Sequence, residues 1–480
     1  MFDNDLLSER ARVTPDKLAV VCIETGQRLT YAQLDARVER AAITLRALLE
    51  PGDRFGLLAH NSLEFLDLFF AAGRAGVIVV PLSTRATEHE LRAIAADCAM
   101  KLLFVGEEFA QFSVIDTQWP VTHRVEEATQ SADRKQTASE DIYCLLYTSG
   151  TTGKPKGVMI PKRQLYWNGY NTVINWGLRD DDVSPVFTPM YHAGGLAAFL
   201  IPIFCAGGTV VIHKSFTTSE VWKTIETEHC TVVLGVPTIW KLLMDAPEFT
   251  TVDLSHVRWF ISGGAPLPQF VIDAYQKRGI AFKQGYGMTE VGVNCFTMTV
   301  QDSVRKPGSI GRPMMFTEVE LREMDDEVGE MWIRGPHVSS GYWNNADATA
   351  EAYAADGWFR TGDLARRDED GFFYIAGRRK EMFISGGVNV YPAEIEAELV
   401  AHPSVSDAAV VAVPDDTWGE VAVAFVVGTA TDQDLIAWLT ARLAKYKIPK
   451  RFVYLDALPR TPYGKVVKGD LRSMLHKPSS

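Results

Sequence analysis

The chain has 480 residues, of which 47% are hydrophobic and 22% are charged. A chain of this length exceeds one ordinary domain, so we expect at least two domains with substantial cores. The formal net charge is −12 and no long block of like charge is present, which argues against nucleic acid or an anionic membrane surface as a partner.

The cysteines and the N-terminal residues favour a cytoplasmic protein. Six cysteines are scattered without close pairs, which excludes zinc-ribbon and redox-pair spacings and suggests reduced thiols. The N-terminal stretch MFDNDLLSERAR is polar and of mixed charge, so it is not typical of a signal peptide.

Strand-like and helix-like segments alternate over about the first 315 residues. The apolar runs predicted as strands are 17–23, 54–59, 77–82, 209–212, 231–237 and 257–264. The amphipathic segments predicted as helices are 31–49, 62–75, 88–97 and 219–229. Continuous apolar strands separated by helices are typical of buried parallel sheets. We therefore predict a large α/β domain built on several parallel sheets, with the polar stretch 126–141 as a surface loop.

One segment needs a separate test for a membrane span. Residues 193–212 carry no charge and are long enough to cross a bilayer. Pro202 and the pair Gly207–Gly208 interrupt this segment, and the residues after the glycines resemble a strand. We expect a buried helix, a turn and a core strand here, and no membrane span.

The pattern changes after about residue 315. Segments 318–335 and 370–378 are shorter, more polar strands with turn signals, which predicts an antiparallel or barrel-like subdomain. Beyond Gly377, the predicted elements are a helix from about Pro392, strands at 408–414 and 421–427, a helix over 433–446 and a strand near 452. We predict a domain at 1–377 and a small, mobile α+β domain at 378–480, with a hinge near Lys380.

The strongest chemical signal is YTSGTTGKPKGV at 147–158. Its glycines let the backbone approach an anion closely, and its hydroxyls and amides supply hydrogen-bond donors to phosphate. It is not a Walker A loop, because the spacing of Gly150, Gly153 and Lys154 is too short and Pro155 replaces the Ser/Thr that binds magnesium. The segment predicts a phosphate-binding loop of another kind.

This loop resembles the phosphate-binding signature of the adenylate-forming superfamily, which contains acyl- and aryl-CoA synthetases, adenylation domains of peptide synthetases and luciferases. Other segments resemble that superfamily's motifs in the same order. They are RLTYAQL (28–34), GRAGVIVVPLSTRATEHEL (73–91), PMYHAGGL (189–196), QGYGMTE (284–290), TGD (361–363), GRRKEMFISGGVNVYPAEIE (377–396) and PRTPYGKV (459–466). The ordered set covers nearly the whole chain and is far more specific than any one motif.

The resemblance implies a two-step reaction with ATP, Mg²⁺ and coenzyme A. A carboxylic acid attacks the α-phosphorus of ATP to give an acyl-adenylate and pyrophosphate, and coenzyme A then takes the acyl group. The residues implied to hold the β- and γ-phosphates are Thr148, Ser149, Gly150, Thr151, Thr152, Gly153 and Lys154. Tyr286 would stack on adenine, and Asp363, assisted by Arg378, would accept the ribose hydroxyls. The residues around the adenine are implied to be Gly263, Gly264, Ala265, Gly285 and Gly287.

The same resemblance implies the groups that act on the reacting atoms. Thr289 would hydrogen-bond the α-phosphate, and Glu290 with Thr152 would hold Mg²⁺, which prefers oxygen ligands. Lys465 would bridge the acyl carboxylate and the α-phosphate, where charge builds up in the transition state. His192 would bind or gate the acid beside the pantetheine tunnel, without a proton-transfer role.

Further residues are implied for the thioester step. Lys380 would be the pivot of the C-terminal domain, whose rotation brings Ser385–Gly386–Gly387 to the thiol tunnel. Asn389 matches a position that supports adenylation in some relatives, and Lys214 matches a basic position that contacts coenzyme A in others.

The acid pocket is predicted from four segments, 191–198, 234–241, 262–267 and 285–295. The candidate acid-contacting residues are Tyr191, Gly194, Gly195, Val236, Trp240 and Asn294. No aspartate follows Tyr191 to pair with an amino group, and Lys241 at one edge is the one cation apparent in these segments. These features disfavour amino acids and dicarboxylates. We predict a medium- or long-chain fatty acid or an aryl or phenylpropenoic acid, which the sequence does not separate.

Three other functions remain alternatives at this point. An adenylation enzyme could deliver its acyl group to a carrier protein, although no carrier domain is apparent in the chain, and a luciferase-like oxygenase would share every motif. A non-catalytic binding protein is disfavoured by the presence of Lys465, Glu290 and Asp363. The sequence also leaves open whether the protein is a monomer or a homodimer.

Overall fold

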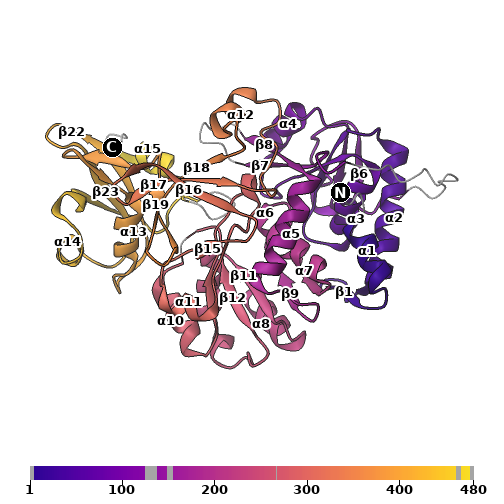
Figure 1. Cartoon of the computed structure of the whole chain (residues 1–480), viewed down its shortest axis with the longest axis horizontal. Helices are drawn as coiled ribbons and strands as arrows, with labels where there is room; N and C mark the ends of the chain where they lie inside the picture. Colours follow the sequence, from indigo (N-terminus) through magenta and orange to yellow (C-terminus); the bar gives the residue numbers. More distant parts are fainter. Residues whose placement is uncertain (1–4, 125–137, 149–154, 266, 461–465, 476–480) are drawn as a thin grey trace.

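The computed structural model describes residues 5–124, 138–148, 155–265, 267–460 and 466–475. Figure 1 shows a large α/β body built from the N-terminal part of the chain, an antiparallel sheet beside it, and a smaller C-terminal unit at the opposite end. The segment 126–141, predicted as a loop, lies largely outside the described residues.

The first sheet ends at the predicted phosphate loop. Its strand order is β6-β5-β3-β4-β7-β8, and all neighbours are parallel except β7 and β8. The strands are β3 (Arg54–Leu58), β4 (Ile78–Pro81), β5 (Leu102–Val105), β6 (Gln118–Pro120), β7 (Ile142–Thr148) and β8 (Lys156–Pro161). The helices in this part of the chain are α1 (Leu6–Val13), α2 (Tyr31–Leu48), α3 (Leu63–Ala75), α4 (Glu88–Asp97) and the 3₁₀ turn η1 (Glu107–Phe109). Capping boxes at Thr30 and Thr87 start α2 and α4, as their sequences favour.

The second sheet contains the segment tested for a membrane span. Its order is β2 (Arg28–Thr30), β1 (Leu18–Cys22), β10 (Thr209–Ile212) and β9 (Val183–Val186). The uncharged segment folds as α6 (Ala193–Gly195), the π-helical turn η2 (Leu196–Leu200), α7 (Ile201–Ala206) and β10. Gly207 turns the chain with φ +86°, so the predicted helix, turn and strand are confirmed. Among the described residues, no helix is both long and apolar enough to cross a membrane.

The third sheet is parallel, in the order β11 (Val232–Gly235), β12 (Trp259–Ser262) and β13 (Phe282–Gln284). Its neighbouring helices are α8 (Thr218–Thr227), α9 (Pro237–Asp245), the 3₁₀ turn η3 (Pro247–Thr250) and α10 (Gln269–Lys277). The carboxyl ends of the three strands lead directly into Val236, Gly263 and Gly285, which are candidate site residues. Helix α5 (Lys162–Trp176) lies next to the π-helical turn and α7.

The strands after about residue 315 are antiparallel, as predicted, and a short antiparallel pair precedes them. The strand pair β14 (Phe296–Thr297) and β15 (Arg312–Pro313) flanks helix α11 (Val300–Arg305). The meander that follows consists of β16 (Glu318–Asp325), β17 (Val328–Arg334), β18 (Phe359–Arg367) and β19 (Phe373–Arg378), with α12 (Ala346–Ala352) between β17 and β18. Its register sets Asp363 opposite Arg378.

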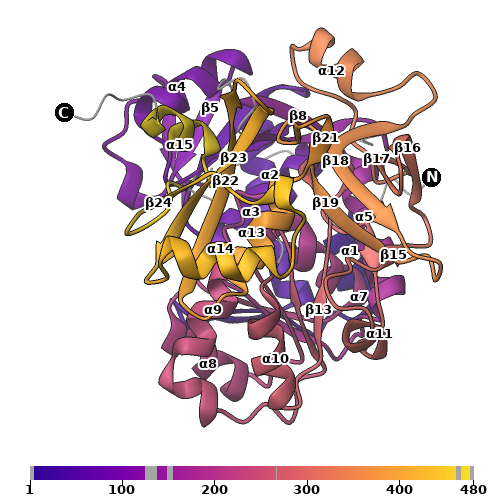
Figure 2. The ribbon, with the colours of Figure 1, turned by 90° about the vertical axis from the view of Figure 1, so that its left-hand side faces the viewer.

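The C-terminal unit has its own core and faces the viewer in Figure 2. Its elements are β20 (Phe383–Ser385), β21 (Val388–Val390), α13 (Pro392–Val400), β22 (Val405–Asp415), β23 (Gly419–Gly428), α14 (Asp432–Thr440), the 3₁₀ turn η5 (Lys445–Lys447), β24 (Arg451–Tyr454) and α15 (Lys468–Leu475). The helix predicted over 433–446 was wrong at its end, because α14 stops at Thr440. The chain then turns so that Lys447 reaches Glu394 at 2.7 Å.

Candidate active site

A buried carboxylate organises the predicted nucleotide site. Asp363 is only 5% exposed, and its two oxygens face different partners. Tyr286 donates its hydroxyl to Oδ2 at 2.6 Å, and Arg378 Nε lies 3.0 Å from Oδ1. The antiparallel register of β18 and β19 places the arginine beside the aspartate. The structure therefore brings Tyr286, which is distant in the sequence, to the neighbouring pair Asp363 and Arg378, and all three were predicted to bind the nucleoside.

The two neighbours of Asp363 are both hydrogen-bond donors. Burial and the neighbouring Asp363 carboxylate raise the pKa of Tyr286 well above its usual value, so the phenol keeps its proton. The Asp363 carboxylate raises the pKa of the Arg378 guanidinium. An ionised carboxylate with lone pairs beyond these contacts is a good acceptor for paired ribose hydroxyls.

The predicted adenine walls lie at the ends of neighbouring strands. Gly285 N donates to Ser262 O at 2.8 Å, and Gly263 N donates to Gly235 O at 3.1 Å. A Cβ added at Gly263 would have no neighbour within 4 Å, so this face is open, and Ala265 is exposed beyond it. At Gly287 a Cβ would lie 2.2 Å from the Val293 carbonyl oxygen, so a close backbone approach requires glycine there.

Thr289 and Glu290 lie on a buried 3₁₀ turn, η4 (Thr289–Val291). Glu290 Oε1 accepts a hydrogen bond from the Tyr342 hydroxyl at 3.0 Å. Burial, with the nearby Glu290 charge, raises the pKa of Tyr342 well above its usual range, so the phenol remains a donor. Among the described residues there is no group of three or more side chains suited to hold a metal. A single carboxylate nevertheless fits Mg²⁺, which commonly takes one or two carboxylates together with substrate phosphates and water.

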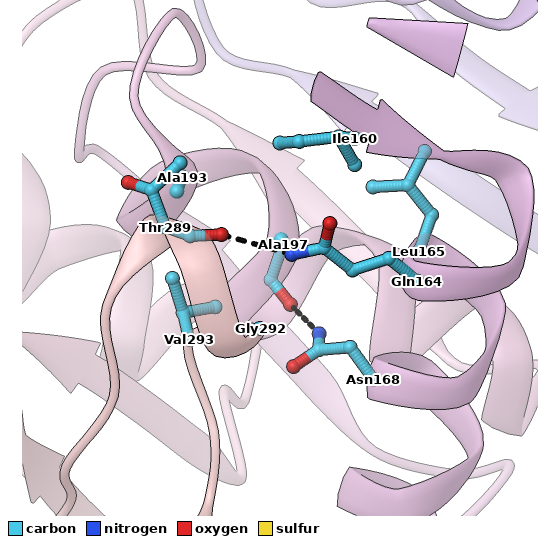
Figure 3. A pocket seen from close by; sticks show the side chains of 9 residues that line it. All are labelled: Ile160, Gln164, Leu165, Asn168, Ala193, Ala197, Thr289, Gly292 and Val293. Atoms are coloured by element: carbon cyan, nitrogen blue, oxygen red, sulfur yellow. Dashed lines mark hydrogen bonds between the residues drawn. The ribbon is translucent and has the colours of Figure 1, made fainter. Parts of the chain in front are cut away.

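A small cavity is lined by this turn, helix α5 and the segment after His192 (Figure 3). Gln164 Nε2 donates to the Thr289 carbonyl at 2.8 Å, and Asn168 Nδ2 donates to the Ala197 carbonyl at 2.7 Å. The residues that line the cavity are Ile160, Gln164, Leu165, Asn168, Ala193, Ala197, Thr289, Gly292 and Val293. Helix α5 thus joins the η4 turn to the segment that follows His192.

The two glycines after His192 have different surroundings. His192 caps α6, with its Nδ1 accepting from Gly194 N at 3.2 Å. A Cβ at Gly195 would lie 2.2 Å from the Pro189 carbonyl oxygen, so this glycine is required for packing. A Cβ at Gly194 would meet just His192 Nδ1, at 3.4 Å. Of this pair, Gly194 is the one that faces open space.

The other residues predicted to contact the acid also differ in whether they lie beside open space or are engaged in packing. Val236 lies near Gly264, where a Cβ would be 3.8 Å from its Cγ1. Trp240 is fully buried and stacks on Phe260 with ring centroids 5.0 Å apart, in the core of the third sheet. The Asn294 side chain donates to the Ala198 carbonyl at 2.8 Å, and Tyr191 is buried in the main core. For Trp240 and Asn294 the structure gives packing contacts, and contact with the acid stays a prediction.

Comparison with known proteins decides the family. A family model described as AMP-binding enzyme matches residues 7–343, and a model described as AMP-binding enzyme C-terminal domain matches residues 394–465. The chain belongs to the AMP-binding enzyme family.

Relatives in this family match over nearly the whole chain. A feruloyl-CoA synthase of Amycolatopsis sp is 40% identical, over 96% of this chain and 97% of its own. The long-chain-fatty-acid–CoA ligase FadD13 of Mycobacterium tuberculosis (strain ATCC 25618 / H37Rv) is 37% identical, over 97% of each chain. The o-succinylbenzoate CoA synthetase (MenE) from Bacillus subtilis, solved with ATP and magnesium ion, has a TM-score of 0.90 and 32% identity, covering 98% of this chain and 99% of the other.

The residues predicted for the thioester step of such enzymes lie in two places. Lys214 Nζ lies 2.6 Å from Glu108 Oε1, and this hydrogen bond raises the pKa of the lysine. Gly386 and Gly387 form the turn between β20 and β21, both with positive φ, and Ser385 beside them is buried. No role was predicted from the sequence for Glu108, whose carboxylate pairs with Lys214 in this structure.

The junction between the two predicted domains is held by charged and polar contacts. Arg379 pairs with Glu330 and Glu323 at 2.6 Å each, which ties it to β17 and to the end of β16. Asn389 Nδ2 donates to Asp325 Oδ2 across the junction. Lys380, the predicted pivot, is exposed between these two attachments.

Some predicted residues lie outside the described part of the chain. They are Ser149, Gly150, Thr151, Thr152, Gly153, Lys154 and Lys465. Thr148 is described and forms the last residue of β7. The roles of all these residues stay predictions.

The residues of α5 that contact the η4 turn, and Tyr342 after β17, which also contacts it, were not identified from the sequence. Gln164 and Asn168 belong to a stripe of amide side chains on α5 that continues with Asn171 and Asn175. All except Asn175 are buried, which is unusual for amides. Their recurrence at three- and four-residue spacing is the signal that could have revealed a polar helix face buried against the site.

Proposed function

We propose that this protein is an ATP-dependent carboxylic acid–CoA ligase. It converts an acid and ATP to an acyl-adenylate and pyrophosphate, and it then transfers the acyl group to coenzyme A with release of AMP. The observation that carries the proposal is the buried Asp363 carboxylate between Tyr286 and Arg378, in a chain that matches acid–CoA ligases over nearly its full length.

The roles of individual residues follow the chemistry of this reaction. Asp363 and Arg378 would bind the ribose, Tyr286 the adenine, and the loop 148–154 the β- and γ-phosphates. Glu290 would hold Mg²⁺, which, when bound, neutralises charge on the phosphates. Thr289 and Lys465 would stabilise the charge that develops at the α-phosphate during attack by the acid.

The second step needs a rearrangement of the C-terminal domain. We infer domains at 1–377 and 378–480 with Lys380 as the pivot. The pivot is supported by Arg379, which pairs with Glu330 of the larger unit, and by the elements after Met382, which belong to the core of the smaller one. Lys380→Pro would fix φ at this position. It should slow thioester formation far more than adenylate formation, measured in separate single-turnover assays. Equal slowing of both steps would contradict the hinge.

For the acid, two classes remain compatible with the surroundings of His192. The open space at Gly194 and the apolar side chains Ala193, Ala197 and Val293 favour an apolar chain or ring over a second carboxylate. The identities to a feruloyl-CoA synthase and to a long-chain-fatty-acid–CoA ligase are nearly equal. We therefore propose an aryl or phenylpropenoic acid or a medium- or long-chain fatty acid.

We also place the reaction in the cytoplasm. All six cysteines are free and buried in the described structure. Reduced, unpaired thiols are typical of proteins that work in a reducing compartment.

The test is release of AMP that depends on both the acid and coenzyme A. Benzoic, cinnamic and ferulic acids are compared with fatty acids of increasing length, with Asp363→Asn as the matched variant that loses the charged acceptor. Turnover with one acid class, lost in the variant, supports the ligase. Oxygen consumption driven by an acyl-adenylate would instead indicate an oxygenase, and transfer restricted to a carrier protein would contradict the use of free coenzyme A.

A further inference from the structure

The three carbonyl groups of the η4 turn are each held by a donor from outside the turn. Thr289 O accepts from Gln164 Nε2 at 2.8 Å, and Glu290 O accepts from Ser339 N at 2.8 Å. Val291 O is hydrogen-bonded by the ring nitrogen Nδ1 of His337. Carbonyls at the end of a short helical turn lack partners within the turn, so outside donors decide where the turn sits.

The His337 ring is the end of a buried hydrogen-bonded chain. His337 is fully buried, and its Nε2 lies 2.8 Å from Thr317 Oγ1. Thr317 Oγ1 in turn accepts from Asn171 Nδ2 at 3.1 Å. The orientation of that amide is fixed, because Asn171 Oδ1 accepts from Asn175 Nδ2 at 2.8 Å and from Phe316 N at 3.3 Å.

These partners determine where the protons lie. Val291 O is a carbonyl and only accepts, so His337 Nδ1 carries a hydrogen. The Thr317 hydroxyl accepts from Asn171 and keeps its own hydrogen, which it can donate to His337 Nε2. This pattern of partners fits a neutral ring with its hydrogen on Nδ1. Burial lowers the pKa of His337, which agrees with a neutral ring.

The segment that carries His337 also holds the Glu290 side chain. Tyr342, five residues further on, donates to Glu290 Oε1, and Ser339 donates to the Glu290 carbonyl. The other side of the turn closes on the same segment, because a Cβ at Gly292 would lie 3.2 Å from the His337 carbonyl oxygen. Backbone and carboxylate of Glu290 are thus fixed from one direction by residues 337–342.

We propose that His337 is a positioning residue that fixes the Thr289–Glu290 pair through the chain Asn171–Thr317–His337–Val291. This inference rests on the proposed function, which assigns the α-phosphate to Thr289 and Mg²⁺ to Glu290. In this assignment His337 acts through Val291 and is given no contact with the nucleotide or the acid. Partners of this outer kind typically change metal affinity or activity by about 10–100-fold when they are removed.

Three substitutions of one residue separate positioning from packing. In His337→Asn the side-chain amide reaches the place of Nδ1 and keeps a donor to Val291. In His337→Gln the amide reaches the place of Nε2 instead, and His337→Phe removes both groups while filling the space. We expect acid-dependent pyrophosphate exchange to fall about 10–100-fold in the Gln and Phe variants and to stay within about threefold of wild type in the Asn variant.

A binding measurement gives a readout that does not need turnover. Calorimetric dissociation constants for MgATP and for adenosine are compared, because adenosine reaches the Asp363 cluster without phosphate or metal. The Gln and Phe variants should bind MgATP about tenfold more weakly and adenosine as wild type does. Thr317→Val should lose less MgATP affinity than His337→Phe does. The double variant should bind MgATP as weakly as His337→Phe alone, as expected when both residues belong to one chain of contacts.

The outcomes distinguish this proposal from the proposed function. An unchanged ratio of MgATP to adenosine affinity in all three variants, or an Asn variant no better than the Gln variant, overturns the positioning role. If His337→Phe does not fold, the comparison of Asn with Gln still decides. A wild-type protein that binds MgATP but activates no acid contradicts the ligase function, while the MgATP measurements still test His337.

Discussion

The η4 turn and the domain junction are held by opposite kinds of contact. Around Thr289–Val291 the donors are buried and mostly neutral, namely an amide, a backbone N–H, a tyrosine hydroxyl and a histidine ring. At the junction Arg379 pairs with Glu323 at the surface and with Glu330, whose side chain is 6% exposed, and Asn389 donates to the exposed Asp325. The Arg379 side chain is 49% exposed and that of its partner Glu323 is 57% exposed.

This difference matches what each region has to do. Buried hydrogen bonds are expensive to leave unmade, so the turn has one arrangement. Exposed ion pairs typically contribute about 0–1 kcal/mol. The contacts of Glu323 and Asp325 can therefore be broken at little cost in free energy, whereas the buried Glu330 holds Arg379 more firmly. On the proposed function, the side that would bind phosphate and Mg²⁺ is therefore held by buried hydrogen bonds, and the junction, held mostly by exposed contacts, is the side that would move.

The largest expected effect tests whether the predicted C-terminal domain contributes a catalytic residue. Lys465→Ala should reduce acid-dependent ATP–pyrophosphate exchange on the order of 10²–10³-fold, because a cation is lost where charge develops. Thioester formation from supplied acyl-adenylate should remain largely intact, which serves as the internal control. Unchanged exchange would show that Lys465 does not take part in adenylate formation, which would then depend on residues of the N-terminal domain.

A second prediction concerns the fixed wall of the acid site. Gly194→Leu places a side chain in open space beside His192. It should lower kcat/KM for long or ring-bearing acids, by an amount equivalent to roughly 1–3 kcal/mol of activation free energy, with little loss for acetate or propionate. Gly195→Ala is the matched control, because its Cβ would clash with the Pro189 carbonyl. It should lower the melting temperature and reduce activity with every acid alike. A uniform loss in Gly194→Leu would place this segment outside the acid site.

A third prediction concerns a charge buried on the fixed side. Lys283 is 6% exposed, with its ammonium 4.4 Å from the Trp259 ring centroid, and burial, with a contribution from Arg258, lowers its pKa to about 8. In the unfolded chain a lysine has a pKa of about 10.4. Between about pH 8 and pH 10.4 the unfolded state therefore binds more protons at this position than the folded state, so the free energy of unfolding should rise with pH over this range.

Lys283→Met should accordingly raise the free energy of unfolding at pH 7 by roughly 1–3 kcal/mol, and the gain should shrink toward pH 10. Urea denaturation at the two pH values measures both quantities. Lys223→Met, on the exposed face of α8, is the control and should change little. A gain that is the same at pH 7 and pH 10 would show that the burial of charge is not its cause.

The smallest effect is expected at the junction itself. Asp325→Ala removes the acceptor of Asn389 and should slow adenylate formation about two- to fivefold, because an exposed contact contributes up to about 1 kcal/mol. High salt should reduce the difference from wild type. Glu327→Ala on the same turn should have no effect, since Glu327 is not part of the contact. A loss as large as that of a buried contact would break the comparison between the two regions.

Much of the fold follows from local patterns in the sequence. The uncharged segment 193–212 was correctly divided into helix, turn and strand because Gly207 and Gly208 interrupt it. The π-helical turn at 196–200 and the early end of α14 at Thr440 were not foreseen, since both depend on packing against neighbouring elements. The predicted roles of the site residues remain predictions, although the structure does bring Tyr286, Asp363 and Arg378 into contact.

The sequence alone indicated the family and predicted the chemistry of the motifs, because each motif is a short run whose residue types and order are visible along the chain. The tertiary structure decided which residues lie against those motifs. His337 and Gln164 lie far along the chain from the η4 turn, and Gly194 and Gly195 are adjacent and chemically identical. Their roles depend on what the fold places beside them, and hydrogen bonds or steric contacts between distant segments leave no pattern in the local sequence.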